Sequence, residues 1–553
     1  MAELLPGSSP DEMFPALSAD QQARVKAHGR IREVAAGEAV VEPNQQAARF
    51  FVVLAGKLEI LQIDDQRENA IAVCGPGMFS GELSLITGRP GFVRIRAAEA
   101  SRLIELDRES LLSLVQTDGE LSDVFLRAFI LRRLELIARK IGDLIVIGSS
   151  HSLDTLRIKE FLTRNYQPYS YIDVERDAEV QELLDRFGVS ITDLPVLICR
   201  RSLVLRNPSS QEIGECLGFN VAIDREHIRD LIVVGAGLAG LAAAVYGASE
   251  GLDVLVVESQ APGGQAGASS KIENYLGFPL GISGHELAGN AYAQAQKFGA
   301  ELLIAREARG LSCDRRPYGL KLEGREILPT RTIVIATGAQ YRRLPLENLS
   351  RFEGNGVYYA ATRLESQLCG GQEVAVVGGS NSAGQAAVFL SQTAKRVYLL
   401  VRASTLAKTM SRYLIRRIDE SQKIELLTET EVTSLHGNDQ LESVQWRNNK
   451  TGKVETHEVS ALFSMIGAIP NSAWLDGCVA CDDAGFIKTG SDLSEDDLKP
   501  ANWSLSRRPT LFETSLPGVF AVGDVRAGNI KRVASAVGEG SVVVSFVHRV
   551  LSE

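Results

Sequence analysis

A glycine-rich turn at residues 235–240 carries residue types that bind phosphate groups. In the segment DLIVVGAGLAG an apolar run enters the turn, and a helical pattern follows it. Gly235 permits the tight turn, Gly237 lets the backbone approach a pyrophosphate at the helix N-terminus, and Gly240 allows the helix to pack closely on the strand. Glu258 closes the next strand about twenty residues further on, where a carboxylate can accept a hydrogen bond from a ribose hydroxyl. The sequence therefore predicts a dinucleotide site.

A second turn, in the segment EVAVVGGSNSAGQ, repeats this pattern with Ala383 at the position of the third glycine. The strand after it ends in Arg402, and a guanidinium can pair with the 2′-phosphate of NADPH. Lys408 and Arg412 are weaker candidates for that contact, and an ordinary solvated strand end is the alternative for Arg402. The residues expected to bind NADPH are Gly378, Gly379, Asn381, Ser382 and Arg402.

The composition limits the class of protein. The chain has 553 residues, of which 45% are hydrophobic and 23% charged, as in ordinary multidomain globular proteins. A net charge of −10 disfavours nucleic acid as a partner. No apolar run reaches about 18 residues and no secretory signal pattern opens the chain, so we expect no membrane span and a cytoplasmic location. Seven cysteines do not form a secreted disulfide framework, and we predict no metal site.

Three blocks of different periodicity must position the two turns. Short alternating runs between Gly/Pro turns over about 30–108 predict a β-roll, and helical periodicity over roughly thirty further residues completes a domain at 1–140. That helical stretch is long enough for a dimer seam or a domain bridge, and we expect a homodimer. Strand and helix patterns alternate over 141–222, which predicts a compact α/β domain. Both glycine-rich turns lie in the third block, 226–553.

The third block resembles the thioredoxin-reductase-like flavoproteins, a fold with two dinucleotide-binding domains, over essentially all of its length. The motifs that carry the resemblance are GGQ, IENYLGFP, ATGA, GVFAVGDVRAG and KRVASAVGEG. The resemblance implies FAD beside NADPH, with an NADPH domain at 345–468 inserted in an FAD domain at 226–344 and 469–553. It also implies that Asp524 holds the ribityl chain and that a helix N-terminus points at the flavin ring. The FAD-binding residues so expected are Gly235, Gly237, Gly240, Glu258, Gly263, Gly264, Gln265, Asn274, Thr337, Gly338, Asp524, Val533 and Ala534.

The cysteine pair of that family is missing from this chain. Where the family reads Cys-Ala-Thr-Cys, the sequence has Ala360 and Arg363 at the two cysteine positions, so no catalytic side chain is identified. We therefore expect an FAD-dependent NADPH oxidoreductase whose reduced flavin passes electrons directly to a small redox protein, a quinone or dioxygen. One alternative is a sensor that binds FAD and NADPH without turnover. Another is a thioredoxin reductase in which Cys478 and Cys481 replace the missing pair.

The middle block resembles the thioredoxin and glutaredoxin fold, also without its cysteines. The segment TDLPVLICR resembles the strand that begins at that fold's cis-proline, which would be Pro195. In that register Ser152 and Thr155 occupy the redox positions, and hydroxyls cannot form a disulfide. The domain is therefore expected to be a redox-inactive adaptor. The cysteines expected to be buried structural thiols are Cys199, Cys74, Cys216, Cys313 and Cys369.

The first block resembles a cyclic-nucleotide-binding domain. Its segment FSGELSLITGRPGFVRIRA matches the phosphate-binding cassette of that family, with Glu82 at the position of the acid that binds ribose. The family's phosphate-binding arginine is replaced by Gly91, although Arg89 or Arg94 could substitute. A nucleotide effector is thus one expectation for this domain, and a role in dimerisation or docking is the other.

Overall fold

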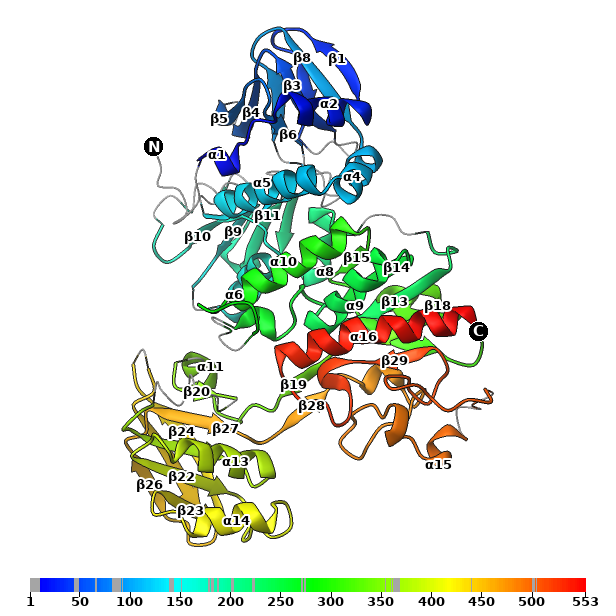
Figure 1. The fold of residues 1–553 in the computed structure, drawn as a ribbon. Helices are drawn as coiled ribbons and strands as arrows, with labels where there is room; N and C mark the ends of the chain where they lie inside the picture. Colours follow the sequence, from blue (N-terminus) through cyan, green and yellow to red (C-terminus); the bar gives the residue numbers. More distant parts are fainter. Residues whose placement is uncertain are drawn as a thin grey trace. The chain divides into compact units, whose positions relative to one another are not determined.

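The computed structural model shows two compact units, one made of residues 1–338 with 472–553 and the other of residues 339–471. Figure 1 shows their helices and strands. The structure describes residues 10–43, 49–64, 67–81, 91, 93–138, 144–150, 152–177, 180, 184–185, 188–199, 203–220, 224–269, 272, 275–353, 355–359, 361, 369–438, 440–499, 503 and 505–553.

The first unit begins with two four-stranded antiparallel sheets, as the alternating pattern predicts. Their strand orders are β1-β8-β3-β6 and β2-β7-β4-β5. Three aromatic rings, those of Phe50, Phe79 and Phe125, pack against one another between the sheet and the helix that follows. The elements are α1 (Pro10–Met13), α2 (Ala19–Ala27), β1 (Arg30–Val34), β2 (Ala39–Val41), β3 (Phe50–Ala55), β4 (Leu58–Asp64), β5 (Arg67–Cys74), β6 (Phe79–Ser80), β7 (Arg94–Ala97) and β8 (Ser101–Leu106).

The long helical pattern after the β-roll forms two helices rather than one. Helix α4 (Arg108–Thr117) ends at Asp118, whose extended backbone breaks the helix, and α5 (Gly119–Ala138) follows. The Asp118 carboxylate accepts a hydrogen bond from the Leu121 amide, 3.1 Å away, so this side chain caps the second helix. Phe129 of α5 packs on Ala293 of the third block, and α5 thus bridges two domains of the same unit.

The middle block folds as a four-stranded sheet of order β10-β9-β11-β12 with helices α6 and α8. The peptide bond between Leu194 and Pro195 is cis, as the resemblance to the thioredoxin fold predicts. Ser152 precedes α6, where its hydroxyl accepts from the Thr155 amide. The elements are β9 (Leu144–Gly148), α6 (Leu153–Arg164), β10 (Ser170–Asp173), β11 (Val196–Cys199), β12 (Leu203–Arg206) and α8 (Ser210–Leu217).

The third block places β13 in the middle of a sheet of order β15-β14-β13-β18-β17-β16, with β29 paired to β18. Residues 231–234 of β13 are apolar and buried, because strands flank β13 on both sides and helices cover it. The elements are β13 (Arg229–Val234), α9 (Leu238–Ser249), β14 (Val254–Glu258), α10 (Gly284–Lys297), β15 (Glu301–Ile304), β16 (Ala308–Ser312), β17 (Tyr318–Leu322), β18 (Ile327–Ile335), α15 (Glu495–Leu498), β29 (Val519–Ala521) and α16 (Val533–Ser552), with short 3-10 turns between them.

The second unit contains a parallel sheet of order β20-β27-β21-β22-β23, an antiparallel sheet of order β24-β25-β26, and the strand pair β19-β28. The boundaries predicted from the sequence, 345 and 468, fall a few residues inside this unit. Its elements are β19 (Ala339–Tyr341), α11 (Leu349–Phe352), β20 (Val357–Tyr358), β21 (Glu373–Val377), α13 (Asn381–Leu390), β22 (Arg396–Val401), α14 (Arg412–Asp419), β23 (Ile424–Thr428), β24 (Thr430–His436), β25 (Ser443–Asn448), β26 (Val454–His457), β27 (Ala461–Ser464) and β28 (Ala468–Pro470).

Helix α16 packs directly on α9, and Figure 1 shows the two helices side by side. The contact depends on a glycine, because a Cβ built on Gly540 would lie 2.1 Å from the Ala239 carbonyl oxygen and 2.9 Å from the Ala242 Cβ. Two turns of backbone therefore touch without an intervening side chain.

We expect Gly540→Ala to destabilise the protein by about 1–3 kcal/mol, because the added methyl group forces α16 away from α9. The matched control is Gly538→Ala in the same helix, where nothing lies within 4 Å of the built Cβ. That control should gain up to about 1 kcal/mol from the better helix propensity of alanine. Thermal unfolding of both variants decides the matter, and equal midpoints would contradict the close contact.

Candidate functional site

The turn between β13 and α9 has the geometry of a phosphate-binding turn. Gly235 has a φ of +104°, and a Cβ there would lie 2.5 Å from the Ala336 carbonyl oxygen. A Cβ on Gly240 would lie 1.9 Å from the Gly235 carbonyl oxygen, so the helix can begin at this depth only with glycine. Gly237 is the N-cap of α9, and among the described residues no side chain accepts a capping hydrogen bond at this helix start.

Glu258 lies at the end of β14, directly against this turn. One carboxylate oxygen accepts from the Ala236 amide at 2.7 Å, and the other from the Gln260 amide at 2.8 Å. Burial raises the pKa of the Glu258 carboxyl, while these two amides favour its ionised form. The acid predicted from its spacing is thus held by the phosphate turn.

The GGQ segment lies against the same turn. Gly263 donates from its amide to the Ala236 carbonyl at 2.7 Å and forms a bridge with Gly237. A Cβ on Gly264 would lie 3.1 Å from the Gly237 Cα, so two glycines face each other and leave a cradle without side chains. Such a cradle fits the pyrophosphate of FAD.

Of the other residues predicted to bind FAD, Thr337 lies beside the phosphate turn. Thr337 follows β18, and its Cα is 3.1 Å from the Cβ position of Gly235. Gly338 has a φ of +70°, and Gln265 precedes a short 3-10 turn. Asn274 lies outside the described residues.

Asp524 sits in a short turn between β29 and α16. Burial raises the pKa of its carboxyl, and Glu539 raises it further while Lys531 lowers it. The neighbouring Gly523 approaches α9, since a Cβ there would lie 2.9 Å from the Ala239 Cβ. The turn is therefore held on the same helix as the phosphate cradle.

Glu539 is a residue of this site that sequence reasoning missed. Its carboxylate accepts from the Gly523 amide at 2.7 Å, from the Arg526 guanidinium at 2.5 Å and from the Asn529 amide at 2.8 Å. It thereby ties α16 to the segment that carries Asp524. No local pattern marks it, because its partners come from a turn ten or more residues away. Val533 and Ala534 open α16, and no side chain caps this helix.

The second turn has a related geometry in the other unit. Gly378 has a φ of +145°, and a Cβ there would lie 2.5 Å from the Met465 carbonyl oxygen. Thr409 donates to the Gly379 carbonyl at 2.6 Å, and the Asn381 side chain accepts from the Ser411 amide at 2.7 Å. The predicted Asn381 contact to a nucleotide thus competes with a contact inside the protein.

Arg402 directly follows β22 and is exposed, which fits both the predicted nucleotide contact and the alternative of a solvated strand end. Its charge lowers the pKa of Glu431, with a smaller effect than those of Arg447 and Asn449. Ser382, Lys408 and Arg412 are exposed as well. The guanidinium can therefore reach a ligand phosphate.

The nucleotide site expected in the first domain is only partly described. Glu82 and Arg89 lie outside the described residues. Arg94 donates to Glu42 at 3.0 Å and to Glu68 at 2.6 Å, and these ion pairs occupy its guanidinium. Arg94 thus has the surroundings of a surface ion pair rather than those of a phosphate ligand.

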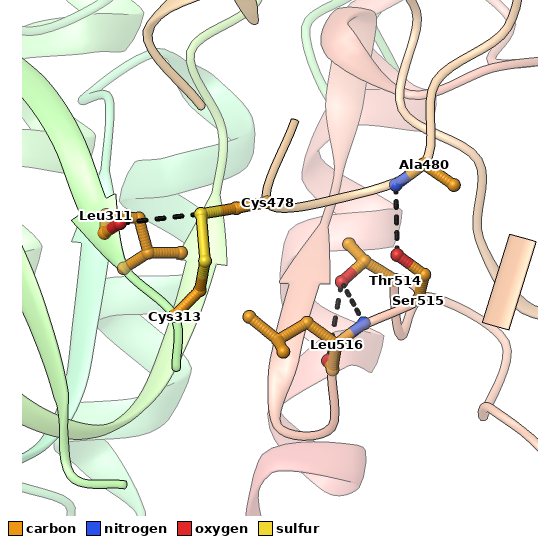
Figure 2. Close-up of a disulfide and its surroundings, with 7 residues drawn as sticks. All are labelled: Leu311, Cys313, Cys478, Ala480, Thr514, Ser515 and Leu516. Carbon is orange, nitrogen blue, oxygen red and sulfur yellow. Dashed lines mark hydrogen bonds between the residues drawn. A yellow bond between two sulfur atoms is a disulfide. The ribbon is translucent and has the colours of Figure 1, made fainter. Parts of the chain in front are cut away.

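The cysteines are paired differently from the sequence expectation. Cys478 forms a disulfide with Cys313 and not with Cys481, as Figure 2 shows. The Cys478 sulfur lies 3.4 Å from the Leu311 carbonyl oxygen, and the nearby Ala480 amide donates to the Ser515 hydroxyl. The two cysteines come from segments on either side of residues 339–471, which spacing alone does not relate.

The expectation of buried structural thiols is wrong for Cys199, Cys216 and Cys313. Cys199 in β11 and Cys216 in α8 form a disulfide within the core of the middle domain. Cys74 and Cys369 are buried and not disulfide-bonded. No sequence pattern predicts the Cys199–Cys216 disulfide, because the two sulfurs meet only when the helix packs on the strand.

Cys481 remains a thiol, and its environment does not favour reaction. Burial raises its pKa, and Asp482 raises it further, so little thiolate is present near neutral pH. Ala360 and Arg363, which the resemblance predicts at the positions of the family's cysteine pair, lie outside the described residues.

Two protein-family profiles match this chain. The family profile described as pyridine nucleotide-disulphide oxidoreductase matches residues 229–540, more than half of the chain. The profile described as cyclic nucleotide-binding domain matches residues 31–118.

Individual relatives are thioredoxin reductases. That of Ureaplasma parvum serovar 3 is 30% identical over 322 residues, which cover 58% of this chain and 96% of the relative. That of Chlamydia trachomatis serovar D is 30% identical over 331 residues, which cover 58% and 98%. The crystal structure of thioredoxin reductase from Streptococcus pyogenes MGAS5005 superposes with a TM-score of 0.51 at 30% identity, over 59% of this chain and 98% of that one.

The chain therefore belongs to the pyridine nucleotide-disulphide oxidoreductase family. It is a thioredoxin-reductase-like, FAD-dependent oxidoreductase, and its cofactors are FAD and NADPH. Within the described residues, no helix combines the length and the apolar character that a membrane crossing requires.

Under non-reducing conditions, alkylation and peptide mapping should recover Cys313 linked to Cys478, with Cys481 alkylated slowly because of its raised pKa. Cys481→Ser should leave the Cys313–Cys478 link intact, and Cys313→Ser is the control that abolishes it. A peptide in which Cys478 is linked to Cys481 would contradict the pairing.

Proposed function

We propose that the reduced flavin of this protein passes its electrons directly to an acceptor, without a dithiol in the same chain. The observation that carries the proposal is the replacement of both family cysteines by Ala360 and Arg363. The pairing of Cys478 with Cys313 supports it, because a sulfur held in that disulfide is not available to form a dithiol with Cys481.

The residues of the chain then have distinct roles toward the cofactors. When bound, FAD and NADPH would supply hydride-transfer chemistry. The amides at the start of α9 would hold the pyrophosphate, and the glycine cradle of Gly237 and Gly264 leaves room for it. Asp524 would hold the ribityl chain, and the N-terminus of α16 would contribute a partial positive charge for the flavin.

The acceptor is a small redox protein, a quinone or dioxygen. The middle domain is a thioredoxin-like adaptor in which Ser152 and Thr155 replace the redox cysteines, and the buried Cys199–Cys216 disulfide is structural. The first domain either binds a nucleotide effector or supports a homodimer. These assignments rest on sequence resemblance and on the burial of the disulfide.

Anaerobic addition of NADPH should bleach the yellow flavin spectrum, and an artificial quinone acceptor should restore it repeatedly. The protein with both Cys478→Ser and Cys481→Ser should behave the same, because neither sulfur lies on the proposed route. Wild-type protein should not reduce thioredoxin. If it does, and the double variant does not, the electrons pass through those cysteines; bleaching without turnover on any acceptor would indicate a sensor instead.

Arg402→Ala should raise KM for NADPH about tenfold with little change for NADH, because only the contact with the 2′-phosphate is lost. The matched control is Arg396→Ala at the other end of β22, where the guanidinium pairs with Glu425 at 3.2 Å. That control should leave the preference for NADPH over NADH unchanged. An equal effect of both variants, or none of Arg402→Ala, would remove the role given to Arg402.

A further inference from the structure

The middle domain contacts the loop that carries the FAD cradle. Arg164, the last residue of α6, donates from its guanidinium to the Gly264 carbonyl oxygen at 2.9 Å. The next residue, Asn165, donates from its side-chain amide to the Gln260 carbonyl oxygen at 3.1 Å. Both acceptors are backbone atoms of the segment 260–264, which follows Glu258 and ends at the cradle residue Gly264.

Neighbouring side chains and backbone atoms surround this contact and bond to it. Asn165 is 1% exposed, and its side-chain amide also donates to the Phe161 carbonyl at 2.9 Å. The Tyr166 ring stacks on His285 at 4.1 Å, and its hydroxyl donates to the His285 carbonyl at 2.5 Å. Arg133 of α5 donates to the carbonyls of Asn165 and Tyr166 at 3.3 Å, so three domains of one unit meet here.

The charge of Arg164 is directed toward the cofactor site. It favours the ionised form of Glu258, the buried acid beside the phosphate turn. Its side chain is 23% exposed, and its only ion-pair partner among the described residues is Glu160, 3.7 Å away on the same helix. Its buried Nε has no hydrogen-bond partner within the described part of the chain. A cation so placed suits the vicinity of an anionic pyrophosphate.

We infer that the middle domain is part of the FAD site, with Arg164 as a positioning residue that fixes the segment 260–264 and adds positive charge beside the cradle. The inference rests on FAD as the cofactor and is independent of the route by which electrons leave the flavin.

The test is the affinity of the full-length apoprotein for FAD, measured by quenching of flavin fluorescence. Arg164→Ala should weaken binding about tenfold or more, because both the hydrogen bond and the charge are lost. Arg164→Lys keeps a charged donor and should recover most of that loss. The matched control is Arg157→Ala on the same helix, whose guanidinium donates to the Pro208 carbonyl and the Asn207 side chain, and it should bind FAD like the wild type.

Salt separates the charge from a purely structural effect. Arg164→Gln keeps hydrogen-bond donors but no charge, so its deficit should shrink as the ionic strength rises from about 0.05 to 0.5 M. If Arg164→Ala does not fold, Arg164→Gln and Arg164→Lys decide in its place. Wild-type affinity in Arg164→Gln and Arg164→Ala, or an equal loss in Arg157→Ala, would overturn the inference. Absence of FAD binding in the wild type would instead overturn the cofactor assignment.

Discussion

Close approach of backbone segments around α9 is the constraint on which the flavin half of the molecule depends. At Gly235, Gly240 and Gly540 a Cβ would lie between 1.9 and 2.5 Å from a carbonyl oxygen. Gly235 and Gly240 let α9 start directly after β13. Gly540 lets α16 pack closely on α9. Helix α9 thus carries the phosphate turn at its N-terminus, and the turn that holds Asp524 packs on the same helix through Gly523.

The loop after β14 extends this arrangement to the rest of the chain. Its glycines lie against the phosphate turn, and its carbonyls accept hydrogen bonds from the middle domain. The middle domain also shares an apolar core with the flavin domain, in which Phe161 and Ile213 pack with Tyr292 and Ile304. The middle domain is thus joined to the flavin domain both by these hydrogen bonds and by a shared core.

The arrangement of the sulfur atoms bears on how electrons leave the flavin. Cys-x-x-Cys spacing makes a redox pair when the thiols open a helix, where the dipole lowers a thiol pKa. Cys478 instead lies in a bend that follows a short 3-10 turn, and Cys481 lies three residues further on, beside Asp482. Cys478 is tied to Cys313, which precedes the inserted unit. Family membership therefore determines the cofactors more firmly than it determines the acceptor.

The sequence by itself determined the features that depend on neighbours along the chain. The two strand-turn-helix units, the acid that follows the first and the β-roll are of this kind, because glycine conformation and side-chain periodicity are local properties. A local pattern was insufficient at Asp118, where one capping side chain divides a predicted long helix.

Only the tertiary structure decided the contacts between distant segments. Glu539 binds the backbone of the turn that carries Asp524, and Cys313 pairs with Cys478 although residues 339–471 separate them in sequence. Arg164 of the middle domain donates to the Gly264 carbonyl in the segment 260–264. Each of these contacts joins residues whose sequence spacing carries no signal, since their separation is set by how domains pack and not by the period of a helix or a strand.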